Sequence, residues 1–321
     1  MKFSVLGCGR WGSFIAWYLD HYNHEVTFWG RTEDPAIHTF LKTRSNEYVT
    51  LPESIKITTN LEEALNASEH IIISISSQAV RSFLGDISKI DGYKDKKYIL
   101  CMKGIEDGTG KRLSEILNEF GISKDNIAVW VGPGHIQAFT SGIPSCMIID
   151  SLNPDLSLFL VKTLRTDLIR FYQGQDLIGS EIGAAAKNVM GIAAGMLDGM
   201  GYSTLKGGLM ARGTREVARL IKACGGNELS AYGLCHLGDY EATLFSEFSH
   251  NRKFGELFSK NQKFGKLAEG VATSSAMLEL AKHTGIELPI TQTVYDVIHN
   301  NITKEEAIKR LFDRENIVEF D

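Results

Sequence analysis

Gly7-Cys-Gly-Arg-Trp-Gly12, directly after the apolar run Phe3-Ser-Val-Leu6, is the most informative stretch of this 321-residue chain. Its glycines, Gly7, Gly9 and Gly12, have the spacing G-x-G-x-x-G, and a helix-like segment follows. Glycines at these positions permit a tight turn and let backbone N–H groups approach a pyrophosphate at the positive end of a helix. We therefore predict a dinucleotide-binding turn; the alternative is a glycine turn that serves packing alone.

Short apolar runs bounded by turn residues alternate with helix-like segments over the first 150 residues. Such runs are typical of strands buried on both faces of a sheet. The intervening segments include residues 61–67, for which Asn60 is placed as the N-cap and Glu63 as the third helical residue. This order predicts an α/β fold with a Rossmann-type, doubly wound parallel sheet. The predicted strands are Phe3–Leu6, Glu25–Trp29, His70–Ser74, Lys97–Cys101, Ile127–Val131 and Ser145–Ile149.

The pattern changes near residue 178, after which no strand-like run is convincing and long helical patterns continue to the end. Residues 182–197 are apolar around almost the whole circumference of a helix, which predicts a central, packed helix. Thr303 and Glu306 have the spacing of a capping box for a terminal helix. At roughly 150 residues per domain, we expect two domains: a dinucleotide-binding domain over residues 1–178 and an all-helical substrate and catalytic domain over residues 179–321.

The amino-acid composition argues against several classes of partner and ligand. Hydrophobic residues make up 43% and charged residues 23%, and the formal net charge is −5 without a dense Lys/Arg block, so neither nucleic acid nor an anionic membrane surface is an expected partner. The five cysteines show no CxxC spacing, which favours a reducing, cytoplasmic setting. Arg10 and three glycines interrupt residues 1–19, so we expect neither a signal peptide nor membrane insertion. No His, Cys, Asp or Glu cluster has metal-ligand spacing, and we expect no metal.

The end of the second predicted strand bears on the cofactor. Arg31 stands where an NAD-selective site usually has an acidic residue that binds the ribose hydroxyls, and a guanidinium suits a 2′-phosphate. We therefore predict that NADP is preferred. Glu33 and Asp34 lie nearby and keep NAD possible, and a solvated turn arginine is the alternative role for Arg31.

Lys187 is the strongest candidate for catalysis. Helical spacing places it in one stripe with Gly183, Met190 and Ala194, where a cation is costly unless it is paired or neutralised. Desolvation and a second nearby cation both lower a lysine pKa towards the range useful for proton transfer. We predict that Lys187 is the general acid/base; the alternative is that it reaches the surface.

Three further sites contain residues that could act in catalysis or substrate binding, and each also has a simpler, non-functional explanation. Lys103 ends a predicted strand and could reach a bound substrate, or it could be an exposed turn lysine. Asp239 could orient a lysine, or it could cap a helix. Ser249-His-Asn-Arg252 could clamp a phosphate or carboxylate, or it could be a solvated turn.

Taken together, these stretches resemble the bacterial NAD(P)-dependent glycerol-3-phosphate dehydrogenases over nearly the whole chain. Several matching stretches in the same order are more specific than any one of them. They are Gly7–Gly12, Lys103–Ile105, Gly132–Pro133, Glu181–Val189, Ala193–Gly195, Asp198–Gly199, Arg212–Gly213, Leu237–Asp239, Asn251–Arg252, Glu269–Gly270 and Pro289–Thr291.

The resemblance implies reversible hydride transfer between NAD(P)H and C2 of dihydroxyacetone phosphate, which gives glycerol 3-phosphate for phospholipid synthesis, and it suggests a homodimer. Lys187 would protonate the C2 oxygen, Lys103 would polarise the substrate and Asp239 would align the amine. The implied cofactor-binding residues are Gly7, Gly9, Arg10, Trp11, Gly12, Arg31, Lys103, Ile136, His250, Leu267 and Glu269. The implied substrate-binding residues are Lys103, Gly132, Gly134, Lys187, Asp239, Ser249, His250 and Asn251, with Asn251 at the phosphate.

Two departures from the family pattern concern the substrate. His250 stands where the family has an arginine, and Gly134 stands where the family often has a serine or threonine hydroxyl. They keep two alternatives open: a related reductase of another small phosphorylated or anionic 2-oxo compound, and a regulator that binds NAD(P) without turnover.

Overall fold

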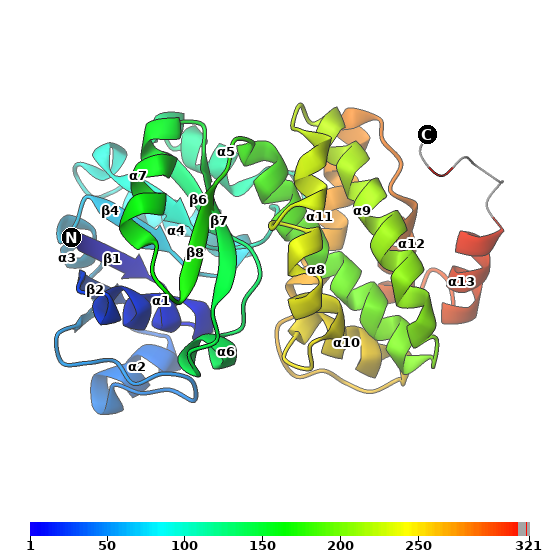
Figure 1. The fold of residues 1–321 in the computed structure, drawn as a ribbon, viewed down its shortest axis with the longest axis horizontal. Helices are drawn as coiled ribbons and strands as arrows, with labels where there is room; N and C mark the ends of the chain where they lie inside the picture. Colours follow the sequence, from blue (N-terminus) through cyan, green and yellow to red (C-terminus); the bar gives the residue numbers. More distant parts are fainter. Residues whose placement is uncertain (314–318, 320–321) are drawn as a thin grey trace.

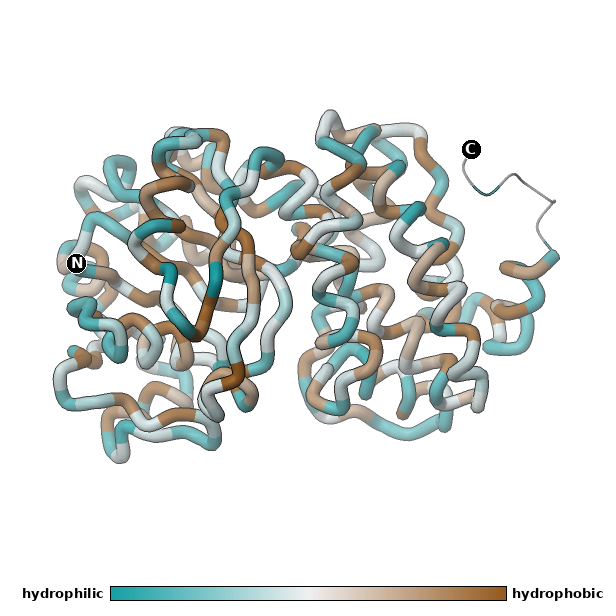
Figure 2. Tube along the Cα trace, viewed as in Figure 1, coloured by the Kyte–Doolittle hydropathy of each residue, from teal (hydrophilic) through white to brown (hydrophobic). Residues whose placement is uncertain are grey.

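A computed structural model describes residues 1–313 and residue 319. Two units lie side by side in it, an α/β domain formed by the first half of the chain and a helical domain formed by the second (Figure 1). Hydrophobic residues follow the central strands, whereas hydrophilic ones are frequent on the outer loops (Figure 2). Within the described residues, no helix is long and apolar enough to cross a membrane.

The α/β domain contains one eight-stranded sheet with the order β3-β2-β1-β4-β5-β6-β7-β8. Every neighbouring pair is parallel except β6 and β7, which are antiparallel. Leu6 at the end of β1 pairs with Trp29 on β2 and with Ile73 on β4, so these strands end at the same edge. The strands are β1 Lys2–Leu6, β2 Glu25–Trp29, β3 Lys56–Thr58, β4 His70–Ile73, β5 Lys97–Leu100, β6 Ile127–Val131, β7 Ser145–Ser151 and β8 Ile169–Gln173.

All six predicted strands are present, and the Rossmann-type α/β prediction is confirmed. Three details were wrong: β7 runs antiparallel to β6, and the sequence reading missed β3 and β8. β3 has only three residues, too few for a recognisable pattern. In β8, buried Ile169 and Phe171 alternate with exposed Arg170 and Tyr172, so no continuous apolar run marks the strand.

Helices cover both faces of the sheet, and alternate residues of a strand face opposite layers. Phe3 and Val5 of β1 belong to the core formed with α1, α2 and α7, whereas Leu6 belongs to the core formed with α3, α4 and α5. The helices of this domain are α1 Arg10–His21, α2 Pro35–Thr43, α3 Leu61–Asn66, α4 Val80–Ile87, α5 Leu113–Glu119, α6 Ile136–Thr140 and α7 Pro154–Leu164.

The helical domain is built around α8, Leu177–Gly199, which is buried over nearly its whole length, as the sequence predicts. Glycines bring α10 close to it, because a Cβ at Gly195 would overlap the carbonyl of Arg252 and a Cβ at Gly255 would overlap that of Ile192. The surrounding helices are α9 Lys206–Ala223, α10 His250–Ser259, α11 Glu269–Thr284, α12 Pro289–Ile298 and α13 Lys304–Phe312. The predicted capping box of Thr303 and Glu306 is present at α13.

A buried carboxylate on α8 ties the two domains together. Glu181 accepts hydrogen bonds from the backbone N–H of Ser114 at 2.9 Å and from its hydroxyl at 2.6 Å, and it pairs with Arg112 at 2.8 Å. These contacts occupy the start of α5 in the α/β domain. They fix α8 against the edge of the sheet where the functional residues collect.

Candidate active site

A cavity of about 800 Å³ is lined by residues of both domains. Its walls are formed by the turn after β1, the end of β2, the segment after β5, the middle of α8 and the start of α10. Gly12 and Gly132 are the candidate residues that do not line it. The candidates that do are Gly7, Gly9, Arg10, Trp11, Arg31, Lys103, Gly134, Ile136, Lys187, Asp239, Ser249, His250, Asn251, Leu267 and Glu269.

The glycine turn between β1 and α1 has the geometry that a phosphate site needs. Gly7 adopts a φ of 125°, and a Cβ there would overlap the carbonyl oxygen of Ser74, while a Cβ at Gly12 would overlap that of Gly7. A Cβ at Gly9, in contrast, would meet no atom of the described chain within 4 Å. Packing therefore requires Gly7 and Gly12, whereas Gly9 leaves open space beside the positive end of α1, where a phosphate group fits.

The end of β2 presents a cation to the cavity. Arg31 keeps 46% of its side chain exposed and has a long ion pair of 3.8 Å with Asp86. Glu33 and Asp34 are the two acidic residues that kept NAD possible. Glu33 is exposed and does not line the cavity. Asp34 is already engaged: it caps α2 through the N–H of Ala36 and accepts a hydrogen bond from the Cys8 thiol at 3.3 Å. Of the charged residues that follow β2, Arg31 is therefore the most available to a ligand in the cavity.

Two lysines from different domains meet at one carboxylate. Nζ of Lys187 lies 2.5 Å from Oδ2 of Asp239, and Nζ of Lys103 lies 2.7 Å from the same oxygen. Lys103 also donates to the carbonyl of Gly132 at 2.7 Å, and Lys187 donates to the hydroxyl of Thr243 at 3.0 Å. The structure thus brings the three predicted catalytic residues together, which the sequence could not show.

Burial dominates the electrostatics of Lys187. Its side chain is 9% exposed, and desolvation lowers its pKa to about 7 against the opposing effect of Asp239, with the charge of Lys103 lowering it further. The ammonium and amine forms are then both populated near neutral pH. A group poised in this way can give up or take a proton in a reaction.

Asp239 is held by an irregular segment between α9 and α10. It ends a short 3-10 turn, η6 Leu237–Asp239, and a π-helical turn, η7 Glu241–Phe245, follows and carries Thr243. Buried His236 anchors the turn, with Nδ1 2.9 Å from the carbonyl of Gly183 and Nε2 2.7 Å from the hydroxyl of Tyr240. Burial lowers the pKa of His236 to about 4, so the ring stays neutral at physiological pH.

A chain of amide contacts connects the lysines to α10. Asn188 donates to the carbonyl of Lys103 at 2.8 Å and accepts from the side chain of Asn251 at 3.0 Å, and Asn251 in turn accepts from the N–H of Gly270 at 2.9 Å. Neither Asn188 nor Thr243 was among the residues predicted from the sequence to act in the site. Asn188 follows Lys187 directly in a matching stretch, and that position was the available signal.

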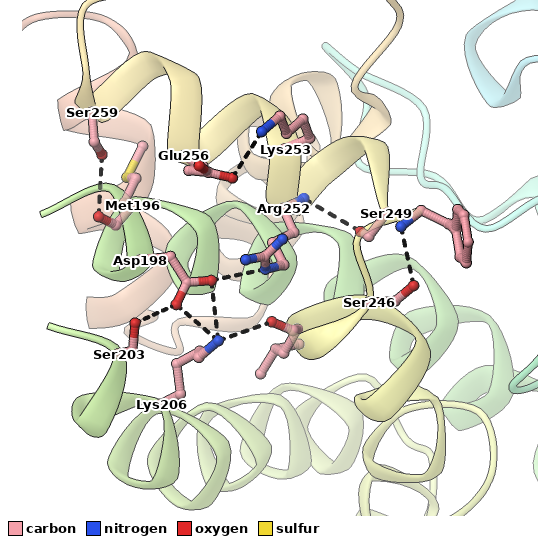
Figure 3. Close-up of polar contacts among 12 residues, drawn as sticks. Met196, Asp198, Ser203, Lys206, Ser246, Ser249, Arg252, Lys253, Glu256 and Ser259 are labelled. Atoms are coloured by element: carbon pink, nitrogen blue, oxygen red, sulfur yellow. Dashed lines mark hydrogen bonds and ion pairs between the residues drawn. The ribbon is translucent and has the colours of Figure 1, made fainter. Parts of the chain in front are cut away.

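The Ser249-His-Asn-Arg252 segment does not act as one clamp. Ser249 caps α10 by accepting from the N–H of Arg252 at 3.3 Å, and the guanidinium of Arg252 binds Asp198 at 2.8 Å rather than lining the cavity. Asp198 also binds Lys206, as Figure 3 shows. The expected contribution of Arg252 to a clamp was wrong: its guanidinium binds Asp198 outside the cavity lining, and this ion pair fixes α10 on α8.

Residues of the helical domain close one side of the cavity. Glu269 accepts from the hydroxyl of Ser77 at 2.8 Å, and burial raises the pKa of its carboxyl group. Nδ1 of His250 lies 3.3 Å from the carbonyl of Leu267, and burial together with Arg10 lowers the pKa of the His250 ring. These contacts place His250 between the glycine turn and the segment before α11.

The arrangement fits chemistry on a small polar substrate next to a dinucleotide. When Lys187 is protonated, two ammonium groups on one carboxylate leave a net positive charge, which suits an oxygen that becomes negative during a reaction. No group of three or more His, Cys, Asp or Glu residues that could hold a metal ion was found among residues 1–313 and 319.

Comparison with known proteins agrees with this geometry. A family model described as NAD-dependent glycerol-3-phosphate dehydrogenase N-terminus matches residues 2–157, and one described as the C-terminus of the same enzyme matches residues 176–309. Glycerol-3-phosphate dehydrogenase (NAD(P)+) of Thermoanaerobacter sp. (strain X514) is 34% identical over 98% of both chains. The protein of that name from Fusobacterium nucleatum is 33% identical over 99% of this chain and 98% of its own. The crystal structure of glycerol-3-phosphate dehydrogenase from Coxiella burnetii matches with a TM-score of 0.90 at 26% identity, covering 98% of this chain and 99% of that one.

Proposed function

The chain belongs to the NAD-dependent glycerol-3-phosphate dehydrogenase family, and on this basis we propose which residues carry out each part of that reaction. It is an NAD(P)-dependent oxidoreductase that converts dihydroxyacetone phosphate to glycerol 3-phosphate. The reaction adds hydride to C2 of the substrate and a proton to the oxygen on C2. The protein must therefore bind the cofactor, hold the substrate and supply that proton.

The residues around the glycine turn fit the cofactor. Open space at Gly9, beside the start of α1, suits the pyrophosphate, and Arg10 and Trp11 line the same part of the cavity. NAD(P)H supplies the hydride when bound. Ile136, His250, Leu267 and Glu269 complete the proposed cofactor contacts.

We assign the preference for NADPH over NADH to Arg31. Its guanidinium is partly exposed in the cavity, with a long ion pair to Asp86 and a position over the Phe83 ring, whereas Asp34 is occupied as a helix cap. The guanidinium of Arg31 can form an ion pair with the 2′-phosphate of NADPH. NADH has an uncharged ribose hydroxyl at that position and therefore offers the guanidinium no charged partner.

Lys187 is the proton donor in this proposal. The observation that carries it is the shared oxygen of Asp239, because it holds the ammonium groups of Lys187 and Lys103 at one point of the cavity. Lys187, whose pKa burial lowers, gives its proton to the C2 oxygen, and Lys103 polarises the C2 carbonyl. Asp239 orients both amines.

The substrate phosphate is assigned to the start of α10. Asn251 lines the cavity there with Ser249 and His250, and the backbone N–H groups of a helix start favour an anion. The ion pair of Arg252 with Asp198 holds this end of α10 in place. Gly134 lines the cavity as well. Gly132 does not line it, but its carbonyl accepts a hydrogen bond from Lys103 and so helps to hold that lysine in place.

We also propose a cytoplasmic homodimer whose cofactor-binding and helical domains meet at residues 178 and 179. All five cysteines are free, which suits a reducing compartment. Leu229 and Tyr232 leave apolar surface exposed on the helical domain, where a second copy could cover it. Light scattering of the purified protein tests the dimer.

The activity is tested by following NADPH and NADH absorbance with dihydroxyacetone phosphate, unphosphorylated dihydroxyacetone and a panel of 2-oxo acids and sugar phosphates. Fast oxidation with dihydroxyacetone phosphate alone supports the assignment of the phosphate site. Comparable rates with dihydroxyacetone would contradict it.

A further inference from the structure

His135 lines the cavity and has no assigned role. It is the N-cap residue of α6, and its ring makes an edge-on contact with Phe248 at a centroid distance of 5.6 Å. Its Nε2 atom is buried and has no hydrogen-bond partner in the described part of the chain. A buried polar atom without a partner costs stability, so such atoms in a cavity wall point to a ligand that completes them.

A second unpaired atom belongs to another residue that lines the cavity. Oδ2 of Asp239 binds both lysines, but its other oxygen, Oδ1, is buried and has no partner among the residues that the structure describes. The carboxylate of Asp239 acts electrostatically on His135 and opposes the effect of burial on its ring. The cavity therefore offers one unpaired acceptor and one unpaired ring nitrogen.

The surroundings of His135 favour the neutral form of its ring. Burial lowers its pKa, and the positive charges of Lys187 and Lys103 act in the same direction, against Asp239 and Glu241. A neutral imidazole has one N–H and one lone pair, so its Nε2 can donate or accept according to the tautomer.

The neighbouring position, Gly134, has no room for a side chain. A Cβ at Gly134 would lie 2.6 Å from Cζ of Phe139 and would overlap its ring. Phe139 cannot easily move, because it is buried and stacks on Phe14 at 5.0 Å. Residue 134 therefore cannot present a hydroxyl to the substrate, and His135 is the next side chain of this loop that lines the cavity.

The substrate has one polar group that the proposed function leaves without a partner. Lys187 and Lys103 serve the C2 oxygen, and Asn251 serves the phosphate, so the hydroxyl on C1 remains. We propose that His135 is a specificity-determining residue whose Nε2 donates a hydrogen bond to this C1 hydroxyl, while the hydroxyl donates to Oδ1 of Asp239. The inference rests on the proposed function of the cavity and identifies how it recognises a hydroxymethyl ketone.

The test compares two substrates that differ only at C1: dihydroxyacetone phosphate and hydroxyacetone phosphate, in which a methyl group replaces the hydroxymethyl group. With the full-length enzyme, His135→Ala is expected to lower kcat/KM for dihydroxyacetone phosphate by about 10- to 100-fold, as for loss of a hydrogen bond to a buried group. The same variant changes kcat/KM for hydroxyacetone phosphate by less than about 3-fold, because that substrate makes no such bond. The KM for NADPH stays unchanged.

His135→Gln is the second variant, because its side-chain amide retains a hydrogen-bond donor. It is expected to recover part of the preference for dihydroxyacetone phosphate over hydroxyacetone phosphate, and it keeps the test valid even if the alanine variant folds poorly. His24→Ala is the matched control, because His24 is also a half-buried histidine with an edge-on aromatic contact, to Phe3, but lies outside the cavity. Equal losses on both substrates, or no loss on dihydroxyacetone phosphate, would overturn the assignment. The wild-type rates test the proposed function separately, because they do not depend on His135.

Discussion

Lys187 and Lys103, which come from different domains, bind the same carboxylate oxygen, Oδ2 of Asp239, at 2.5 and 2.7 Å. The proposed proton donor and the proposed polarising cation are therefore held at a fixed spacing only when the two domains are docked. The Glu181 contacts with Ser114 and Arg112 secure that docking from the buried side of α8. This arrangement leads to four predictions.

The first concerns pH. Reduction needs the protonated form of Lys187, whose pKa burial lowers to about 7, so kcat/KM for reduction should fall about tenfold per pH unit above that value. Oxidation of glycerol 3-phosphate needs the neutral amine and should rise over the same range. Initial rates in both directions between pH 5 and 10 check this, and pH-independent reduction up to pH 9 would contradict it.

The second prediction concerns the opposite effects of Lys103 and Asp239 on the pKa of Lys187. Lys103 lowers the pKa of Lys187 and Asp239 raises it, so Lys103→Ala should move the alkaline limb of reduction to higher pH and Asp239→Asn to lower pH. Each variant should also lose about 100-fold or more in kcat at its optimum, because a charged group at the reacting oxygen or its orienting partner is removed. If the alkaline limb shifted in the same direction in both variants, the effect of these neighbours on Lys187 would not be electrostatic.

The third prediction concerns the cofactor. Arg31→Asp removes the free guanidinium and adds an acceptor for ribose hydroxyls, so the ratio of kcat/KM for NADPH to that for NADH should fall by about 100-fold. The long ion pair with Asp86 contributes little, so stability should hardly change. An unchanged cofactor ratio in a folded variant would remove Arg31 from the 2′-phosphate site.

The fourth prediction separates two glycines of one turn. Gly7→Ala places a Cβ against the carbonyl of Ser74 at a φ of 125°, and it should lower the free energy of unfolding by about 1–3 kcal/mol. Gly9→Ala meets no described atom within 4 Å and has an ordinary φ of −72°, so the fold should tolerate it while cofactor affinity drops. Thermal melts with and without NADPH measure both; a stable Gly9→Ala variant with unchanged affinity would argue against a phosphate beside Gly9.

Local patterns predicted much of this fold. The glycine turn, the central helix α8 and the capping box of Thr303 and Glu306 depend on short-range spacing, and all three are present. β3 and β8 were missed because one is too short and the other alternates buried with exposed residues. The antiparallel direction of β7 depends on its connection to β6, which no residue pattern records.

The candidate site was predictable as a set of residues but not as a set of contacts. Lys187 was found because a cation interrupts an apolar helix stripe, whereas its partners Asp239 and Thr243 come from an irregular segment with no period. Arg252 was expected to face the cavity, yet Asp198 binds it, because the close approach of α10 to α8 sets its direction. Contacts of this kind depend on tertiary packing.

The proposed role of Lys187 is tested most directly by the rate of NADPH oxidation by Lys187→Ala with saturating dihydroxyacetone phosphate. The affinity of the same variant for NADPH is measured beside it by fluorescence titration. We expect a loss of about 100- to 10,000-fold in kcat, the usual range for a removed general acid, with cofactor affinity nearly unchanged. Turnover near the wild-type rate, in a variant that still binds NADPH, would show that Lys187 is not the proton donor.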